Sequence, residues 1–175
     1  MVLTLSEINK YIQIAKRNHK EGKLKEANQI YKNLINKKIF TYDLLISYGL
    51  FNKEINNLKI AKNLFTLSIK KYPLFIKPYL LLSEILSLEN SFKEALKILF
   101  LAKEIEQNNS DIDYNLSILY KKNKLYKEAL NYINNALIIS PKVEIYKILK
   151  ADILIDNFQN QEAKQILGNL ILDKN

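Results

Sequence analysis

The chain has 175 residues and a formal net charge of +9, with no Cys, one His, three Gly and three Pro. The lack of Cys and the single His exclude disulfides, thiolate catalysis and Cys-based zinc sites, and leave almost no His-based metal or catalytic site. So few Gly and Pro argue against a sandwich or barrel with many tight turns and indicate helices. No glycine-rich phosphate loop is present, so we expect a binding protein with no catalytic residues, no metal and no cofactor.

One alanine returns at a fixed interval along the chain. The interval is 34 residues, without insertion or deletion, and the positions are Ala27, Ala61, Ala95, Ala129 and Ala163. A large apolar residue follows each alanine by four positions, and a small residue precedes it by twelve. A period of this length is a signature of stacked helical repeats. We therefore divide the chain into five repeats, at about residues 8–41, 42–75, 76–109, 110–143 and 144–175.

Each repeat contains two segments with apolar residues at the helical spacing of three or four. In the second repeat, the first segment carries Leu44, Tyr48 and Phe51 on one face. Residues that tolerate a left-handed backbone separate the two segments, at Gly22, Asn56, Asn90, Asn123 and Asn157. Pro73 and Pro141 lie between repeats, where a helix has to stop. The predicted elements, in chain order, are thus ten helices in five pairs, the last from about Gln161 to Leu172.

Over about residues 8–175 this pattern resembles the tetratricopeptide repeat (TPR) family. The Trp of the family pattern is absent, and Tyr11, Leu45 and Tyr79 take its place in the first three repeats. The resemblance implies an all-α fold, a right-handed superhelical solenoid of antiparallel helix pairs that forms one array. It also implies a concave groove, lined mainly by the first helix of each repeat, that binds a peptide or another segment of a partner protein.

First-helix positions at helical spacing predict which side chains line this groove. In the first repeat they are Ile12 and Lys16. In the later repeats they are Ile46, Leu50, Leu80, Glu84, Tyr114, Ile118, Ile148 and Asp152. The stripe is unusually apolar, and a contiguous exposed apolar patch usually marks an interaction site. The alternative is a tight superhelix in which these side chains pack on neighbouring repeats.

The excess of positive charge lies in the first half of the chain. Residues 1–78 hold 15 basic and 5 acidic residues, whereas residues 79–175 hold 12 and 13. The basic patch Lys16, Arg17, Lys20 and Lys23 suggests contacts with an anion or a nucleic acid. However, Arg17 is the only Arg, and Arg dominates specific base contacts, so we favour a solvated surface over a nucleic-acid site. His19, in the same region, is predicted to be a surface residue rather than a ligand.

The ends of the sequence carry two further expectations. The first residues lack the basic and apolar regions of a signal peptide, and no stretch approaches the roughly 18 apolar residues of a membrane span. We therefore expect a cytoplasmic protein with no membrane span. The last predicted helix carries an apolar face with no following repeat to cover it, formed by Ile166, Leu167, Leu170 and Ile171. We expect either a further repeat or domain downstream, or a homodimer through this helix.

Three functional hypotheses follow. The leading one is a non-enzymatic protein–protein interaction scaffold that binds a peptide or partner segment in the groove. The second is the non-catalytic N-terminal TPR head of a larger enzyme such as a transferase, by analogy with similar arrays. The third is anion or nucleic-acid binding through the basic first half.

Overall fold

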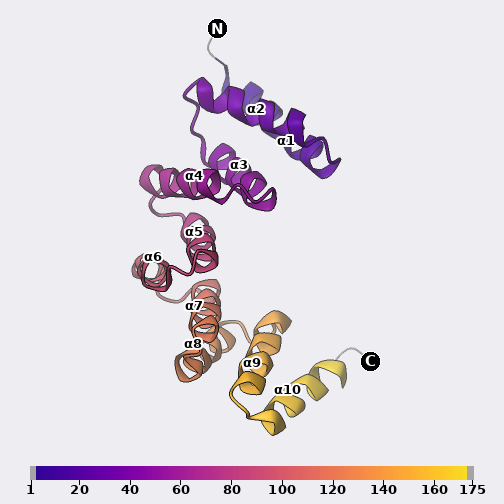
Figure 1. Ribbon diagram of the computed structural model, residues 1–175, viewed down its shortest axis with the longest axis vertical. Helices are drawn as coiled ribbons and strands as arrows, with labels where there is room; N and C mark the ends of the chain where they lie inside the picture. Colours follow the sequence, from indigo (N-terminus) through magenta and orange to yellow (C-terminus); the bar gives the residue numbers. More distant parts are fainter. Residues whose placement is uncertain (1–2, 173–175) are drawn as a thin grey trace. The chain divides into compact units, whose positions relative to one another are not determined.

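The computed structural model describes residues 3–172, except for the side chain of Leu172 (Figure 1). These residues form ten α-helices and no strand, so the fold of the described part is all-α. The helices are α1 Leu5–Lys20, α2 Leu24–Asn36, α3 Tyr42–Glu54, α4 Leu58–Lys71, α5 Lys77–Leu88, α6 Phe92–Ile105, α7 Ser110–Lys122, α8 Tyr126–Ile139, α9 Glu144–Asp156 and α10 Asn160–Leu172. They pack as sequential antiparallel pairs, which confirms the prediction of two helices in each repeat.

The chain divides into two compact units, residues 1–78 and 79–175. The N-terminal unit contains α1–α4, and the C-terminal unit contains α6–α10 and most of α5. This boundary coincides with the change in charge along the sequence, because the net charge is +10 before it and −1 after it. The two units therefore differ in charge as well as in sequence position.

Polar side chains determine where several helices begin. Thr4 and Glu7 form a capping box at α1, in which the Thr4 hydroxyl accepts from the Glu7 N–H and the Glu7 carboxylate accepts from the Thr4 N–H. At α3 the Thr41 hydroxyl accepts from the Leu44 N–H, and at α7 the Asn109 side chain plays the same part. These contacts satisfy backbone N–H groups that the first helical turn leaves without a partner.

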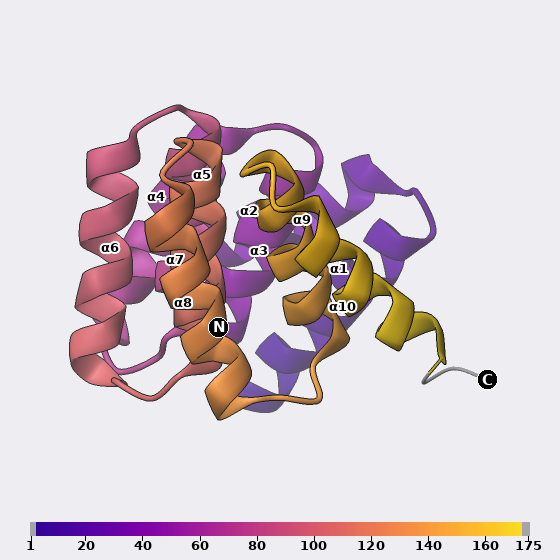
Figure 2. The same ribbon diagram turned by 90° about the horizontal axis from the view of Figure 1, so that it is seen from below.

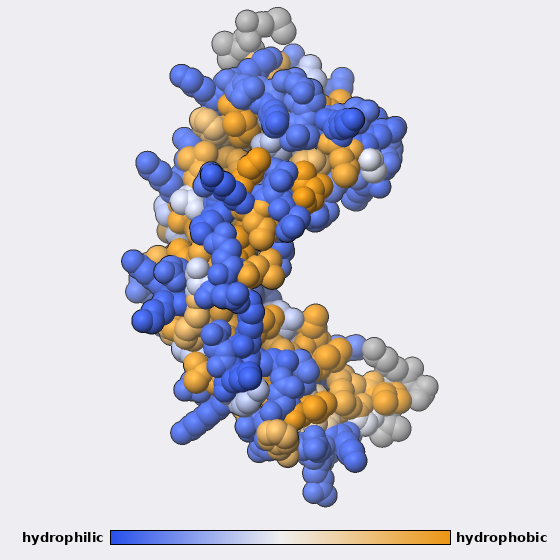
Figure 3. Space-filling view, in the orientation of Figure 1, coloured by the Kyte–Doolittle hydropathy of each residue, from blue (hydrophilic) through white to orange (hydrophobic). Residues whose placement is uncertain are grey.

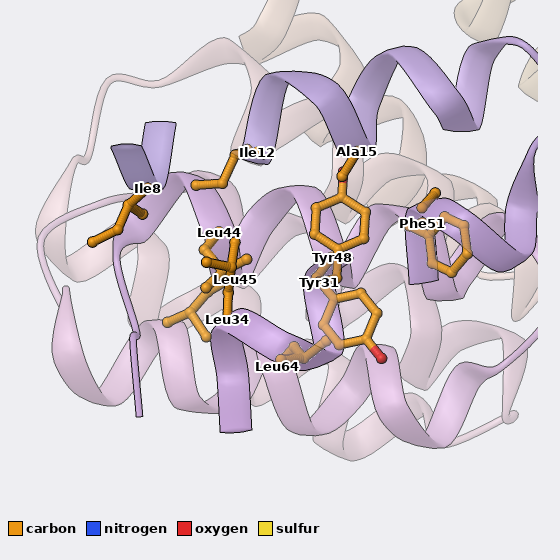
Figure 4. Close-up of a cluster of buried hydrophobic side chains, with 11 residues drawn as sticks. Ile8, Ile12, Ala15, Tyr31, Leu34, Leu44, Leu45, Tyr48, Phe51 and Leu64 are labelled. Carbon is orange, nitrogen blue, oxygen red and sulfur yellow. The ribbon is translucent and has the colours of Figure 1, made fainter. Parts of the chain in front are cut away.

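The N-terminal unit packs its two helix pairs around one apolar cluster (Figure 4). Ile12 of α1, Tyr31 of α2 and Leu44 of α3 are almost completely buried in it. The Tyr31 ring stacks on the Tyr48 ring with their centroids 5.0 Å apart. The centroid of the Phe51 ring lies 5.7 Å from that of the Tyr31 ring. Many of the repeated apolar positions of the first two repeats thus meet in this cluster.

Small residues twelve positions before each repeat alanine let the two helices of a pair approach closely. The second repeat has Gly49 at this place, and a Cβ atom there would lie 2.3 Å from Cε1 of Phe65 on α4. The other repeats have Ala15, Ser83, Ser117 and Ala151, all buried. The prediction that this position must be small is therefore confirmed, and most strictly at Gly49.

The turns inside the repeats follow the 34-residue register more closely than the sequence analysis predicted. Gly22, Asn56 and Asn90 have positive φ angles of 76°, 61° and 58°, as expected. In the last two repeats the prediction of Asn123 and Asn157 is wrong, since the left-handed residues are Lys124 and Phe158 at 60° and 61°. These five left-handed residues lie five positions before the repeat alanine, and a sixth left-handed residue, Lys38 at 59°, lies in the α2–α3 connection. The backbone geometry of the turn is kept even where the side chain does not favour it.

The C-terminal unit has a more divided core. One cluster joins α8 and α9 around Ile133, Tyr146 and Ile153, and a second lies at the last helix pair, which Figure 2 shows side by side. In that second cluster Ala151 and Leu154 of α9 pack against Ala163 of α10. No helix in the described part of the chain is long and apolar enough to cross a membrane.

The apolar face of α10 is partly covered. Ile166 and Leu167 pack against the α9–α10 cluster, and Leu170 is only 9% exposed. Ile171 is 66% exposed. Three of these four side chains are thus at least partly covered by packing within the chain, which the sequence pattern of α10 by itself does not indicate.

Candidate functional site

A pocket of about 320 Å³ opens beside the first helices of the third and fourth repeats. Its walls come mainly from α5 and α7, with one side chain from α6. The lining residues are Ser83, Glu84, Ser87, Leu99, Tyr114, Asn115, Ile118 and Leu119. Three side chains predicted to line a groove, Glu84, Tyr114 and Ile118, thus come together in one pocket of the C-terminal unit.

Helix α9 extends this surface with a row of isoleucines. Ile145, Ile148 and Ile155 are 53%, 49% and 47% exposed. Their spacing of three and seven residues places them on one face of the helix, together with Asp152. Ile148 and Asp152 are predicted from the sequence, whereas Ile145 and Ile155 are not, although they share the same helical spacing. On the face of the molecule drawn in Figure 3, apolar residues interrupt the polar surface in several places.

An ion-pair network holds α9 next to α7. Lys121 Nζ lies 2.8 Å from a carboxylate oxygen of Asp152 and 3.0 Å from one of Asp156. Burial alone would lower the pKa of the Lys121 amine, but the hydrogen bonds to the two carboxylates outweigh burial and raise it. Ile118 precedes Lys121 by about one turn, and Ile148 precedes Asp152 by one turn. The network therefore holds the part of α7 that carries Ile118 next to the part of α9 that carries Ile148.

Tyr114 forms a firm wall of the pocket. Its ring stacks on that of Tyr146, with the centroids 5.0 Å apart. The Tyr146 hydroxyl in turn donates to the Asp111 carboxylate at 2.6 Å. Burial raises the pKa of both tyrosines, so they keep their protons at neutral pH. The aromatic wall is consequently held on one side and open to the pocket on the other.

The remaining predicted groove residues differ in how much surface they offer. Ile12 is fully buried in the core and Ile46 is 5% exposed, so both are packing residues rather than open surface. Leu50 and Leu80 are half-buried, and the carboxylate of Asp152 is bound by Lys121. The assignment of an open groove position to Ile12 and Ile46 is thus corrected, because helix spacing alone did not reveal which of two apolar faces each residue occupies.

The predicted basic patch borders a second cleft, of about 720 Å³, in the N-terminal unit. The cleft is lined by Gln13, Lys16, Arg17, His19, Lys20, Tyr31, Ser47, Leu50, Phe51 and Glu54. Burial raises the pKa of the Tyr31 hydroxyl at its base to about 12, and the nearby carboxylates of Asp43 and Glu54 act in the same direction. The cleft is therefore lined both by cationic side chains and by Tyr31, whose hydroxyl stays protonated and uncharged at neutral pH.

Carboxylates engage most of the basic patch. Lys16 binds Asp43 at 2.7 Å, and Lys23 binds Glu21 at 2.6 Å. Arg17 lies 3.8 Å from the same Glu21, whose pKa is lowered by the hydrogen bond and charge of Lys23. Lys20 is exposed and forms no ion pair with any residue that the structure describes. The patch thus presents fewer free cations than the sequence implied.

His19 departs from its prediction as a surface residue. Its side chain is 21% exposed, and Nε2 lies 3.0 Å from a carboxylate oxygen of Glu54. The ring also meets Phe51 edge-on, with the centroids 5.0 Å apart. Within residues 3–172, no group of three His, Cys, Asp or Glu side chains is arranged to hold a metal ion. His19 is therefore part of the packing between α1 and α3.

Comparison with known proteins supports the fold. No protein-family model and no curated protein matches the sequence. Solved structures do match: a chain of MamA from Desulfovibrio magneticus RS-1, residue 41 to the end, superposes with a TM-score of 0.75 at 15% identity, covering 94% of this chain and 93% of that chain. A thermophilic TPR protein of Thermus thermophilus gives 0.76 at 12% identity, covering 93% of this chain and 89% of that one.

A tetratricopeptide repeat protein of Parabacteroides merdae gives a TM-score of 0.85 at 15% identity, covering 94% of this chain and 64% of that protein. Identities this low carry information about the fold and not about the ligand. Together with the ten paired helices and the 34-residue period, these structural matches confirm the predicted all-α fold of antiparallel helix pairs. The chain has the fold of the tetratricopeptide repeat proteins.

Proposed function

We propose that this chain is a protein-binding scaffold and that its C-terminal unit binds a partner segment with large apolar side chains. One observation carries the proposal: exposed Ile118, Ile145, Ile148 and Ile155 line two neighbouring helices beside a pocket. Scattered exposed apolar residues are normal on a protein, but a row on one helix face next to a second such helix is a patch. This role requires no catalytic residue.

The pocket supplies a place for one anchoring side chain of the partner. Leu99, Ile118 and Leu119 give it apolar walls, and the fixed Tyr114 ring closes one side. Its volume of about 320 Å³ is at the lower limit of small-molecule pockets, which suits an apolar side chain better than a cofactor. Asn115 and Ser87 can bind the backbone of the segment at the pocket mouth.

The isoleucine row on α9 then provides the rest of the contact area. Ile145, Ile148 and Ile155 extend over about ten residues of helix, a length of roughly 15 Å. A partner helix with apolar residues at i, i+3 and i+7 fits a row of this length. Asp152 lies within the row, and Lys121, which also pairs with Asp156, offsets part of its charge and leaves its carboxylate at the edge of the apolar contact.

A peptide selection tests the proposal. Random peptides displayed on phage are selected on the wild-type chain, and their affinities are then measured for the variant Ile118→Asp plus Ile148→Asp. We expect enrichment of peptides with two or more large apolar residues. The double variant should bind them at least about tenfold more weakly, because charged groups replace apolar contact surface.

The matched control is Ile138→Asp on α8, where the side chain is 78% exposed and lies outside the proposed surface. This variant should bind the selected peptides like the wild type. Far-ultraviolet circular dichroism should show unchanged helix content in both variants, since all three isoleucines are exposed. Selected peptides that lack apolar residues, or that bind the double variant as tightly as the wild type, would contradict the proposal.

A further inference from the structure

The connection between α4 and α5 exposes two large apolar side chains at the tip of a tight turn. The Phe75 N–H donates to the Tyr72 carbonyl oxygen at 3.2 Å, which closes a turn with Pro73 at its second position. Proline favours that position because its φ angle is already suitable. Leu74 is 77% exposed and Phe75 is 51% exposed. The N-terminal unit thus displays an apolar tip that does not contribute to its core.

Aromatic contacts hold this tip in place. The Phe75 ring lies 4.5 Å from the Tyr42 ring, and the Tyr72 ring lies 5.6 Å from Tyr42, measured between centroids. The Tyr72 hydroxyl donates to the Phe40 carbonyl oxygen at 2.9 Å, which joins the turn to the α2–α3 connection. In Figure 1 both connections lie on the same side of the N-terminal unit. The exposed side chains are therefore presented by a braced structure.

Lysines flank the tip in the sequence, which has no acidic residue for many positions on either side of it. Between Glu54 and Glu84 the sequence contains no acidic residue and five lysines, Lys59, Lys62, Lys70, Lys71 and Lys77. Lys70, Lys71 and Lys77 are exposed and flank the turn directly. Lys71 Nζ lies 5.3 Å from the centroid of the Phe40 ring, and Lys37 and Lys38 belong to the same α2–α3 connection. Asp43, which follows Tyr42, is bound by Lys16.

We propose that this lysine-flanked turn, residues 70–77, docks the chain on an anionic lipid surface. Leu74 and Phe75 enter the boundary between headgroups and acyl chains, while the lysines contact lipid phosphates and carboxylates. The combination matters because one or two apolar residues, or a few lysines, bind a bilayer only weakly when alone. No helix needs to cross the membrane for this attachment.

The details of the turn favour lipid over nucleic acid. Single-stranded nucleic acids bind through aromatic rings that are free to stack on bases. Tyr42 and Tyr72 already pack against each other, and the most exposed residue is the aliphatic Leu74. The only arginine of the chain, Arg17, lies on α1 and not at this turn. An aliphatic tip flanked by lysines instead matches the layered chemistry of an anionic bilayer.

Vesicle flotation tests the proposal. The wild-type chain is mixed with vesicles of phosphatidylcholine alone, or of phosphatidylcholine with about a third phosphatidylserine, and the bound fraction is measured at several lipid concentrations. We expect binding to the mixed vesicles and little to phosphatidylcholine. Leu74→Ser plus Phe75→Ser should reduce the partition coefficient at least about tenfold, and so should Lys70→Gln plus Lys77→Gln.

Matched controls come from the C-terminal unit. Ile138→Ser removes an equally exposed apolar side chain, and Lys127→Gln plus Lys164→Gln removes two exposed lysines; both should bind vesicles like the wild type. Equal binding to the two vesicle types, or no loss in the Leu74 and Phe75 variant, would overturn the proposal. So would displacement by inorganic phosphate, or binding to a single-stranded oligonucleotide that the lysine variant loses and the apolar variant keeps.

Discussion

An ion pair joins consecutive repeats in each unit, and the two pairs differ in burial. In the N-terminal unit Lys16 of α1 binds Asp43 of α3, and the two side chains are 35% and 45% exposed. In the C-terminal unit Lys103 of α6 binds Asp113 of α7, and their side chains are 27% and 2% exposed. Water can readily replace the partner in the first pair, whereas the Asp113 carboxylate of the second is almost completely buried. We therefore expect the same kind of contact to add little stability in the N-terminal unit and much more in the C-terminal unit.

The surfaces of the two units show a related contrast. The N-terminal unit has a net charge of +10, and its exposed apolar tip lies among lysines. The C-terminal unit has a net charge of −1, and its row of exposed isoleucines on α9 includes Asp152, which pairs with Lys121. One repeat architecture thus carries two surfaces of different chemistry, which is why we assign them different ligands.

The largest effect is expected when the buried pair loses its cation. Lys103→Met keeps most of the length of the side chain but leaves the Asp113 carboxylate buried without a counter-ion. An uncompensated buried charge destabilises a fold by about 3–5 kcal/mol. Urea unfolding followed by circular dichroism should show this loss. Hydrogen exchange of α6 and α7 amides should accelerate more than that of α1 and α3.

Removing both members of the pair provides the control. Lys103→Met combined with Asp113→Leu leaves no buried charge, so the double variant should recover a large part of the stability that the single variant loses. If the free energy of unfolding of Lys103→Met alone is within about 0.5 kcal/mol of the wild-type value, the loss is well below the cost of a buried unpaired charge. That result would mean that Asp113 reaches water and that the two ion pairs do not differ in burial.

The second effect concerns alkaline pH. Tyr31 has a pKa of about 12 in the folded protein, against about 10 when it is exposed. Since the folded state holds this proton more tightly, the stabilising contribution is complete below pH 10 and disappears as the pH rises towards 12. Two pKa units correspond to roughly 2–3 kcal/mol. Tyr31→Phe should therefore lose less stability than the wild type between pH 9 and 12.

Unfolding at a series of pH values measures this difference, with circular dichroism as the signal. Tyr11→Phe is the matched control, because Tyr11 is 43% exposed. It should follow the wild-type pH curve. Identical curves for Tyr31→Phe and the wild type would contradict the burial of the Tyr31 hydroxyl.

The sequence predicted the helix pairs because the 34-residue period repeats a backbone requirement. Gly49 has to be small, and a left-handed residue has to close the first helix at Gly22, whatever side chains surround them. The prediction is wrong at Lys124 and Phe158. There the place in the 34-residue repeat, and not the preference of Asn for a left-handed backbone, determines which residue has a positive φ angle. Periodicity therefore determined the backbone better than the types of individual residues did.

The candidate surfaces were less predictable, since they depend on which side of a helix another element covers. Ile12 and Ile148 have similar positions in their repeats, yet Ile12 is fully buried and Ile148 is 49% exposed. The pairing of Lys16 with Asp43 involves residues 27 positions apart, which no local pattern reveals. Leu74 is exposed because a turn closes around Pro73, and its neighbours in sequence are otherwise typical of a repeat boundary.

A third prediction compares two glycines, one in each unit. Gly49→Ala places a methyl group against the buried Phe65 ring, so we expect a loss of about 2 kcal/mol from overpacking. Gly168 lies inside α10, where an added methyl group would meet no atom within 4 Å, so Gly168→Ala should instead stabilise the chain by about 0.5–1 kcal/mol. Thermal unfolding should shift in opposite directions, and a gain in stability for Gly49→Ala would contradict the close approach of α3 and α4.

The smallest effect is expected at the exposed ion pair. In Lys16→Met the Asp43 carboxylate keeps the Ser47 hydroxyl, which donates to it at 3.1 Å, and gains water where the ammonium was. The loss should stay below about 1 kcal/mol and should vanish in about 1 M salt, where charges are screened beyond about 3 Å. Urea unfolding at low and high salt measures both quantities, with Lys25→Met on α2 as the control for an exposed lysine. A loss as large as that of Lys103→Met, unchanged by salt, would mean that Asp43 is as dependent on its cation as Asp113, and the contrast between the two units would not hold.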